Sequence, residues 1–375
     1  MDIWIRPDQV FDGQALVSGQ VVHLSGDEIA EVAPNAPVNV QVQAVPGILT
    51  PGYLDLQVNG GGDVLLNSTP TRAGMQTMAG AHRRFGTVGI MPTVITDHPD
   101  VLDRAADAAI AAKGDKGILG LHIEGPHISQ ARRGTHAGEF VRSFDERTMA
   151  VVAGLRKAGV VVMITVAPEA VTTEQIAKLA SMGAIVSLGH TDASAEGMKA
   201  AIDAGAECAT HLFNAMSPMS SRQPGAVGAV INSDLYSGII CDGVHVDDAM
   251  VGLAYRARPV QDRLFLVSDS MSTVGGRDSF ELYGAKITLQ NGRLLNAEGS
   301  LAGAHVTQAE GVRRLVLSVG LDLQQALRMA VTVPAACIRA PAYAELIGRR
   351  SEDVVLLTPD LKYHAAVSDM ALAAA

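Results

Sequence analysis

Aromatic residues, cysteines and long apolar runs are scarce in this chain. Aromatics make up only 4% of its 375 residues, so aliphatic side chains must fill the core of a sequence that is 48% hydrophobic. The three cysteines, Cys208, Cys241 and Cys337, form no Cys-X-X-Cys pair, which favours structural thiols in a reducing cytosol. The most apolar stretch, 160–167, is too short to cross a membrane, and the first ten residues lack the layout of a signal peptide. We therefore expect a cytoplasmic protein without a membrane segment.

The chain also lacks an excess of positive charge. Its formal net charge of −10 argues against nucleic acid or an anionic membrane surface as a partner. A small phosphorylated ligand is still compatible with this charge, because one local arginine can bind it. The length of 375 residues suits a large barrel with a smaller appended domain.

What the sequence does contain is a series of apolar runs bounded by glycine and polar residues. Eight of them occupy the middle of the chain, at 53–59, 89–96, 117–125, 160–169, 184–191, 208–215, 238–245 and 264–270. Segments between them, such as 71–86, 145–159 and 193–205, have helical spacing and close on glycine. Apolar strands alternating with helices indicate a parallel sheet covered on both faces, and eight units predict a closed (β/α)8 barrel of the α/β class.

Polar side chains gather at one end of these runs. The residues at or just beyond the C-terminal ends are Gln57, Asn59, Glu124, His190, His211, His245 and Asp269. In a (β/α)8 barrel, active sites form on this face. A doubly wound open sheet, the alternative, would place polar residues mainly near one crevice. The distribution favours the barrel, with a site at its mouth.

The two ends of the chain differ from its middle. Short alternating runs at 15–34 and 349–367 resemble hairpins. We predict that residues 1–48 and 343–375 form one small, discontinuous β-sandwich domain beside a catalytic barrel at 49–342. The alanine-rich tail, 371–375, is expected to be disordered.

Glu124, His190 and His211 are candidates for a metal site. A carboxylate and two imidazoles from three strand ends suit zinc or another divalent transition metal. Each residue alone is weak evidence, because a single histidine is more often packed or on the surface. Their shared position at one barrel end favours a ligand set. His122, within a run and two residues before Glu124, is predicted either to be structural or to support a ligand from behind.

Asp269, Arg222 and three consecutive glycines each allow two interpretations. Asp269 ends the last run, and it is either a general base acting on water or an acid that caps the following loop. Arg222, in a loop rich in serine, glycine and proline, either binds an anion or is an ordinary solvated arginine. Glycines 60–62 lack the lysine and spacing of a P-loop, so they are interpreted as a close turn over the barrel mouth.

Longer motifs follow one another from residue 51 to about 304. They are PGYLDLQVNGGGD, GLHIEGPHIS, RRGTHAGEF, SLGHTDAS, THLFNAMSPMSSRQPGAVGA, CDGVHVDD, LVSDSMS and GSLAGA. In this order they resemble the N-acetylglucosamine-6-phosphate deacetylases of the amidohydrolase superfamily. The most specific part is THLFNAM with Arg-X-Pro-Gly eleven residues beyond its histidine.

The resemblance implies a role for individual residues. One divalent ion per subunit, Zn2+ first among the candidates, would be held by Glu124, His190 and His211. Asp269 would be the catalytic acid and base, and His136 would polarise the acetyl carbonyl or grip the sugar. The remaining contacts with a sugar-phosphate substrate would come from Thr135, Asn214, Ala215, Arg222, Asp242, His245, Leu301, Ala302 and Gly303.

Gln57 and Asn59 have the spacing at which one branch of the family carries His-X-His and a second metal. The branch resembled here carries Gln-X-Asn and works with a single metal. Neutral amide oxygens are weak zinc ligands beside imidazole, and a site with three protein ligands needs no second ion. After SLAGA the chain has HVTQ, where the family usually has a serine-containing LAGS and a leucine-threonine-methionine run, which bears on acyl and sugar specificity.

The predicted activity is hydrolysis of N-acetylglucosamine 6-phosphate to glucosamine 6-phosphate and acetate, in amino-sugar breakdown. A homodimer is implied, with Arg222 acting in its own site or in its neighbour's. One alternative is a deacetylase or deformylase of a related substrate, such as N-acetylgalactosamine 6-phosphate. The other is a non-catalytic sugar-phosphate sensor, which would need neither the metal ligands nor Asp269.

Overall fold

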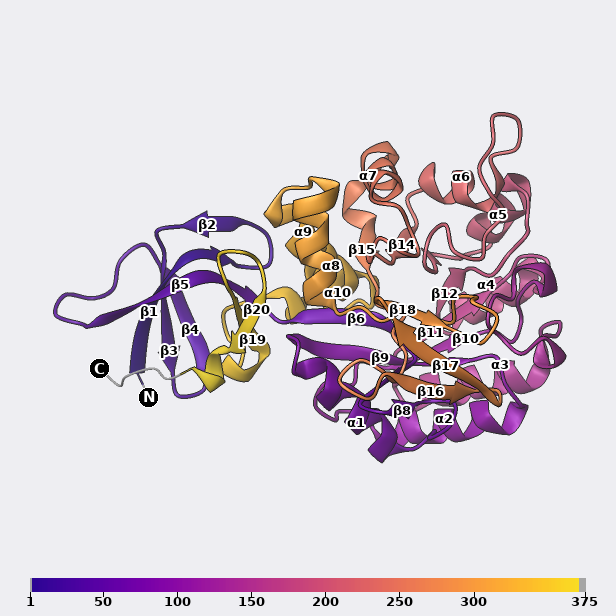
Figure 1. Cartoon of the computed structure of the whole chain (residues 1–375), viewed down its shortest axis with the longest axis horizontal. Coiled ribbons are helices and arrows are strands. Elements are labelled where there is room, and N and C mark those ends of the chain that lie inside the picture. The colour runs from indigo at the N-terminus through magenta and orange to yellow at the C-terminus, as the bar shows by residue number, and fades with distance from the viewer. Residues whose placement is uncertain (1, 371–375) are drawn as a thin grey trace.

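Eight parallel strands form the centre of the larger lobe in the computed structural model, which describes residues 2–370 (Figure 1). The tail 371–375, predicted to be disordered, lies outside the described residues. The strands are β6 (Tyr53–Val58), β9 (Thr87–Ile95), β10 (Leu121–Glu124), β11 (Val162–Val166), β12 (Ile185–Leu188), β13 (Cys208–Ala209), β14 (Tyr236–Ile239) and β15 (Leu264–Leu266). They pair in chain order from β6 to β15, so each of the eight predicted runs contributes one strand.

The sheet closes between β6 and the segment that follows β15. Val58 forms a parallel bridge with Ser270, and the Asp269 amide donates to the Gln57 carbonyl at 3.0 Å. A doubly wound sheet would leave two free edges at these strands. The (β/α)8 barrel predicted from the sequence is therefore confirmed.

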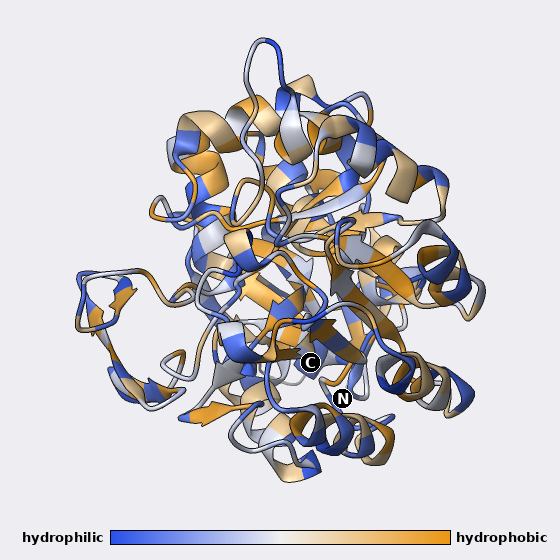
Figure 2. Cartoon of the chain, turned by 90° about the vertical axis from the view of Figure 1, so that its right-hand side faces the viewer, coloured by the Kyte–Doolittle hydropathy of each residue, from blue (hydrophilic) through white to orange (hydrophobic). Residues whose placement is uncertain are grey.

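Helices surround the barrel, and Figure 2 shows apolar strands at its centre with mixed helical faces around them. They are α1 (Arg72–Arg83), α2 (Pro99–Ala111), α3 (Glu146–Lys157), α4 (Thr173–Ser181), α5 (Ala195–Asp203), α6 (Gly225–Ile231), α7 (Asp248–Ala257), α8 (Gln308–Arg314), α9 (Leu323–Ala330) and α10 (Thr332–Cys337). The three segments predicted as helices contain α1, α3 and α5. Gly86, Gly159 and Gly205, which end those segments, have φ values of +85°, +76° and +113°, a backbone that favours glycine after a helix.

Strands from both chain ends form the smaller lobe, as predicted. A seven-stranded sheet joins β1 (Asp2–Phe11), β2 (Leu16–Ser18), β3 (Val21–Ser25), β4 (Glu28–Ala33), β5 (Val42–Pro51), β19 (Val354–Leu357) and β20 (Tyr363–Ala366). Ile5, Leu49 and Leu356 belong to a separate apolar cluster within this lobe. The boundaries at residues 48 and 343 stay a prediction, because β5 continues to Pro51 and β6 begins at Tyr53 without a linker.

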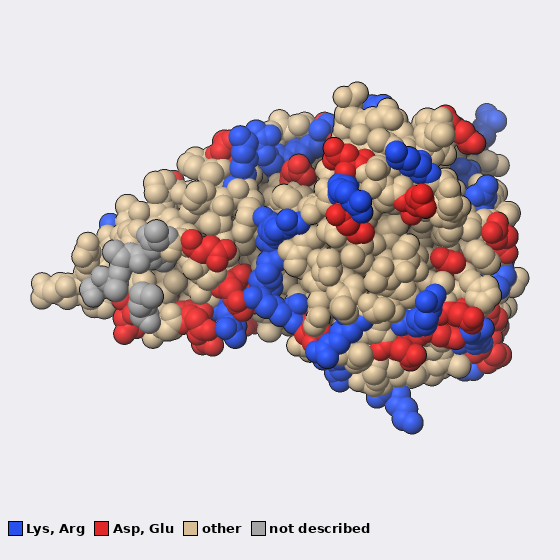
Figure 3. Space-filling model, turned by 60° about the horizontal axis from the view of Figure 1, so that its bottom comes forward, with Lys and Arg blue, Asp and Glu red and all other residues tan. Residues whose placement is uncertain are grey.

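Ion pairs join the C-terminal part of the small lobe to the barrel. Arg83 of α1 pairs with Asp353 at 2.7 Å, and Lys116 pairs with Glu352. On the face in Figure 3, basic and acidic side chains lie close together along the junction of the two lobes. Within residues 2–370, no helix is long and apolar enough to cross a membrane.

An antiparallel meander, which the sequence analysis did not predict, covers part of the barrel mouth. It consists of β16 (Ser279–Leu282), β17 (Ala285–Gln290) and β18 (Arg293–Leu295), beside the short pair β7 (Gly60–Gly61) and β8 (Val64–Leu65). Leu282, Ile287 and Leu294 of the meander pack with Ile95 and Met271, which lie at the mouth. The meander therefore helps to wall the space above the strand ends.

Candidate active site at the barrel mouth

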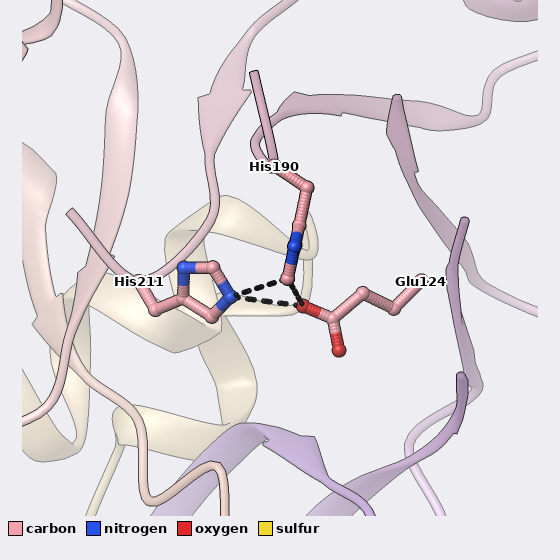
Figure 4. A group of neighbouring side chains, drawn as sticks. All are labelled: Glu124, His190 and His211. Atoms are coloured by element: carbon pink, nitrogen blue, oxygen red, sulfur yellow. Dashed lines mark hydrogen bonds and ion pairs between the residues drawn. The ribbon is translucent and has the colours of Figure 1, made fainter. Parts of the chain in front are cut away.

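Glu124, His190 and His211 converge on one point at the barrel mouth (Figure 4). The Glu124 Oε1 atom lies 3.0 Å from His211 Nε2 and 3.3 Å from His190 Nε2, and the two Nε2 atoms are 3.1 Å apart. All three residues are buried, with exposed fractions of 2%, 5% and 3%. They come from the ends of β10, β12 and β13, so parallel pairing of distant segments brings them together.

The backbone turns sharply at several of these strand ends. His190, His211 and Asp269 have φ values of +48°, +30° and +50°, a backbone conformation that residues other than glycine rarely adopt. Such conformations cluster at functional sites, where the surrounding structure holds them. Here each turn comes directly after a barrel strand and lets the side chain face the mouth.

The donor atoms of this group fit a divalent cation. His190 Nδ1 lies 2.8 Å from the Arg132 carbonyl, which can only accept, so Nδ1 carries the proton and Nε2 offers its lone pair. The Glu124 Oε1, His190 Nε2 and His211 Nε2 atoms thus lie 3.0–3.3 Å from one another. Zinc bond lengths and tetrahedral angles give ligand separations of roughly 3.3 Å, close to those observed. Glu124, His190 and His211 are also the group in the described chain that could hold a metal ion.

The close contacts within this group shift the pKa values of Glu124 and His211. Burial opposes the charged form of Glu124, but the adjacent imidazoles of His190 and His211 hold the pKa of its carboxyl well below the usual range. Burial likewise disfavours a charged His211, yet the Glu124 carboxylate raises the pKa of this imidazole. A strongly ionised carboxylate beside two imidazoles is a strong ligand set for zinc or a related ion.

Asp269 lies where the barrel closes on β6, near Glu124, His190 and His211. Burial of its carboxyl, reinforced by the negative charge of Glu124, raises the pKa of Asp269 to about 6. Two side-chain amides contact its Oδ1 atom: Gln57 Nε2 at 3.1 Å and Asn59 Nδ2 at 2.7 Å. A carboxyl with a pKa near neutrality can both accept and return a proton.

His136 is held as a neutral imidazole in a fixed orientation. Burial lowers its pKa to about 3. Its Nδ1 atom faces the Thr96 hydroxyl at 2.7 Å and the Thr96 backbone N–H at 3.4 Å. Because the N–H can only donate, Nδ1 is the acceptor and the ring proton is on Nε2. His136 can therefore donate a hydrogen bond to an oxygen without changing its charge.

A cavity of about 190 Å³ opens onto these residues. Most predicted site residues line it: Asn59, Glu124, Thr135, His136, His190, His211, Asn214, Ala215, His245, Asp269, Leu301 and Gly303. Asp242 lies behind His245 and accepts from its Nδ1 atom at 2.6 Å. Gln57 lies beneath the rim and contacts both Glu124 and Asp269.

Two predicted substrate contacts are placed away from the cavity. Ala302 is 3% exposed and packs into the apolar cluster beneath the meander, while its neighbours Leu301 and Gly303 line the cavity. Arg222 lies in an exposed stretch, 218–224, that does not line the cavity. No residue of the described chain forms a hydrogen bond or ion pair with its side chain. A role for Arg222 in this subunit's own site is therefore not supported.

Sequence reasoning missed several residues of the site. Ile95, Gly134 and Met271 line the cavity, and Thr96 orients His136. Ile95 and Thr96 end the second apolar run, so the position rule that selected the other strand ends applies to them too. Nothing in the sequence indicates the bond between Thr96 and His136, because it joins residues 40 positions apart.

The structure also places His122, the three cysteines and the glycines at 60–62, which the sequence analysis interpreted as structural. His122 is 1% exposed inside the barrel and contacts the Thr165 hydroxyl at 2.7 Å. The three cysteines are buried and free. A Cβ at Gly60 would lie 2.5 Å from the Val64 carbonyl, and one at Gly61 would lie 2.9 Å from His82. The glycines thus allow the close turn that the sequence suggested.

A (β/α)8 barrel with a carboxylate and two imidazoles at its mouth is the architecture of the amidohydrolases, and a model of the amidohydrolase family matches residues 48–348. The chain is 42% identical to N-acetylgalactosamine-6-phosphate deacetylase of Shewanella sp. (strain ANA-3), over 84% of this chain and 80% of that protein. It is 35% identical to N-acetylglucosamine-6-phosphate deacetylase of Haemophilus influenzae, over 84% of each.

A solved structure agrees with these sequence comparisons. The crystal structure of N-acetylglucosamine-6-phosphate deacetylase from Pasteurella multocida superposes with a TM-score of 0.89 at 31% identity, over 97% of both chains. The chain belongs to the N-acetylglucosamine-6-phosphate deacetylase family of amidohydrolases, as its motifs predicted.

Proposed function

We propose that the chain hydrolyses the acetamide of N-acetylglucosamine 6-phosphate and releases glucosamine 6-phosphate and acetate. The observation that carries this proposal is the convergence of Asp269 and the Glu124–His190–His211 group on one cavity. Family membership supports the same reaction, because relatives are named for it. A sugar-phosphate sensor would need neither a metal-ligand set nor an acid with a pKa near neutrality.

Glu124, His190 and His211 would hold one divalent ion, for which we propose zinc. When bound, the ion supplies Lewis acidity, which lowers the pKa of a neighbouring water to about 7 and polarises the acyl carbonyl. The chain contributes the alignment of the donors. The Arg132 carbonyl fixes the His190 ring through Nδ1, so that Nε2 faces Glu124 and His211.

Asp269 moves the proton in this proposal. With a pKa near 6 it is largely ionised at neutral pH and takes a proton from the attacking water. It then gives that proton to the amide nitrogen, because an amine anion would be too poor a leaving group. The same carboxyl thus acts first as base and then as acid.

His136 would hold the acyl oxygen. His136 lines the cavity, its Nε2 carries the ring proton as a neutral donor, and the low pKa keeps the imidazole from being protonated further during the reaction. A preorganised donor aimed at a developing oxyanion lowers the barrier without reorganisation. Thr135 precedes it on the same rim and would contact the sugar.

The sugar phosphate would lie on the opposite rim. Asp242 accepts from His245 Nδ1, which leaves His245 Nε2 for a phosphate or hydroxyl, and Asn214 and Ala215 lie beside it. Leu301 and Gly303 would close over the acetyl group. Arg222, exposed and unpaired in its own subunit, would reach the phosphate in the site of a second subunit of a homodimer.

N-Acetylgalactosamine 6-phosphate is a second candidate substrate. The relative that is 42% identical is named for deacetylation of that sugar. Both sugars carry the same acetamide and phosphate, so the residues discussed above serve either. The proposed location, from the sequence alone, is the cytoplasm.

Acetate release by the purified protein tests the proposal. The panel contains both N-acetylhexosamine 6-phosphates and unphosphorylated N-acetylglucosamine, with zinc and other divalent ions measured on the same sample. We expect release from the phosphorylated sugars and about one ion per chain. Release from none of them, with the ion present, would support the sensor and overturn the proposed reaction.

A further inference from the structure

Gln57 and Asn59, at the end of β6, both donate hydrogen bonds to one oxygen of Asp269. Gln57 Nε2 donates to Asp269 Oδ1 at 3.1 Å and to Glu124 Oε1 at 3.0 Å. Asn59 Nδ2 donates to the same Oδ1 at 2.7 Å and to the Asp269 carbonyl at 3.2 Å. Both amides are almost fully buried, with exposed fractions of 2% and 3%. Two donors from one strand thus converge on a single carboxylate oxygen.

The orientation of each amide follows from its surroundings. Each NH2 group faces two oxygen acceptors, and a flipped amide would press its own oxygen against them. The Asn59 Oδ1 atom is buried without a partner, which is unfavourable for a polar atom. The side chain keeps this orientation because the two hydrogen bonds that its NH2 group donates to Asp269 outweigh the cost of one buried, unpaired amide oxygen.

The backbone holds the same two segments together. The Asp269 N–H donates to the Gln57 carbonyl at 3.0 Å, and the Asn59 N–H donates to the Ser270 carbonyl at 2.9 Å. These bonds close the barrel and fix the register between the amides and the acid. The side-chain bonds then set the rotation of the carboxyl group within that frame.

The arrangement leaves the two Asp269 oxygens unequal. Oδ1 already accepts two hydrogen bonds, which is the capacity of its lone pairs. Within residues 2–370, no hydrogen bond reaches Oδ2. A proton taken from water therefore has one available position.

We propose that Gln57 and Asn59 are positioning residues for Asp269, which direct its proton transfer to Oδ2. This rests on the proposed role of Asp269 as acid and base. The two amides then fill the second-metal position with hydrogen-bond donors instead of leaving it vacant. Their NH2 groups donate to Glu124 Oε1 and Asp269 Oδ1, so these carboxylate oxygens already have partners.

The test removes the donors while keeping the shape of the side chains. Gln57→Met and Asn59→Leu are the principal variants, and Asn59→Ala is a smaller change in case leucine disturbs the fold. The matched control is Asn67→Ala, since Asn67 is an amide at the same mouth that bonds Ile95 and Asp97 and touches neither carboxylate. Metal content, thermal stability, kcat and KM are measured for each protein.

We expect each donor-free variant to keep one ion per chain and a KM near wild type, while kcat falls roughly tenfold to a hundredfold. The Asn67→Ala control should lose stability without that fall in kcat. Wild-type kcat in the metal-loaded variants would overturn the positioning role and leave the proposed reaction intact. Loss of the ion, or a rise in KM at constant kcat, would overturn it as well, by assigning the amides to the ligand set or to substrate binding. Failure of the proposed function is distinct, because the wild-type protein itself would then release no acetate.

Discussion

The candidate site combines residues at strand ends with residues on the loops between strands, and the two groups are held in different ways. The strand-end group is Gln57, Asn59, Glu124, His190, His211 and Asp269. The loop group is Thr135, His136, Asn214, Arg222, His245 and Leu301. Barrel closure fixes the first group, through bonds such as that between the Asp269 amide and the Gln57 carbonyl. In the second group, His136 Nδ1 contacts Thr96 and His245 Nδ1 contacts Asp242, whereas the Arg222 side chain forms no hydrogen bond or ion pair within the described chain.

This difference separates chemistry from recognition. The proposed ion ligands and the proposed proton-transfer acid lie on the barrel frame, where small errors in position are most harmful. The proposed sugar and phosphate contacts lie on loops, which vary more easily without disturbing the barrel. Changes at strand ends should therefore affect kcat or metal content, and changes on loops should mainly affect KM. The exception is His136, whose proposed role at the acyl oxygen should make its loss affect kcat.

The largest effect is expected at Asp269. In Asp269→Asn the side chain keeps its size but can no longer accept a proton, so kcat should fall by roughly a thousandfold or more while the ion stays bound. Steady-state kinetics and metal analysis on one sample check this. Asp63→Asn is the control, because Asp63 lies on a loop of the same mouth and bonds the Arg277 backbone. Near-normal turnover in metal-loaded Asp269→Asn would show that the proton moves elsewhere.

Loss of a ligand should give the next largest effect. His211→Ala removes one of three donors, so metal affinity should fall by about a hundredfold or more and the purified protein should contain little zinc. Added zinc should restore part of the activity, which makes the loss smaller than at Asp269. The surface variant His364→Ala should keep its ion. If His211→Ala retained one tightly bound ion, the proposed ligand set would be wrong.

The same difference explains how far the sequence could predict the site. Glu124, His190, His211 and Asp269 were found because strand ends of a parallel barrel meet on one face. The meander 279–295 and the bond from Thr96 to His136 were not, because they depend on packing between distant loops. Arg222 was recognised through a motif, but its exposure could not be deduced from that motif. The periodicity of the sequence therefore predicted the barrel and the residues at its strand ends. The contacts between loops could be found only in the structure.

A substitution of Arg222 tests the loop group, and in the proposed homodimer it tests a contact between two subunits. Arg222→Ala should raise KM for the phosphorylated sugar by roughly tenfold to a hundredfold, because a charge-assisted bond to phosphate is lost. Lysine should rescue it only in part, since it lacks the planar fork. Unphosphorylated N-acetylglucosamine is the control substrate and should be unaffected. An equal loss of kcat/KM for both sugars would mean that Arg222 does not bind the phosphate.

If the protein forms the proposed homodimer, mixed dimers show whether Arg222 acts in its own subunit's site or in its neighbour's. Inactive Asp269→Asn subunits are combined with Arg222→Ala subunits, and activity is measured at a low concentration of the phosphorylated sugar. If Arg222 acts across the interface, the hybrid contains one site with both residues intact, and the mixture should exceed the activity of either variant. If it acts within its own subunit, no intact site forms and activity should not rise.

The smallest expected effect lies where a loop residue depends on a strand end. Thr96 follows β9, and its hydroxyl and N–H hold His136 Nδ1 as an acceptor, so that Nε2 carries the proton. Thr96→Val removes the hydroxyl bond and keeps the shape, which should lower kcat by roughly fivefold to tenfold, the equivalent of about 1–1.4 kcal/mol. Thr96→Ser keeps the hydroxyl and should stay close to wild type. If Thr96→Val left kcat unchanged while His136→Ala abolished it, His136 would be oriented without Thr96. Loop residues would then be less dependent on the strand frame than the rest of the site indicates.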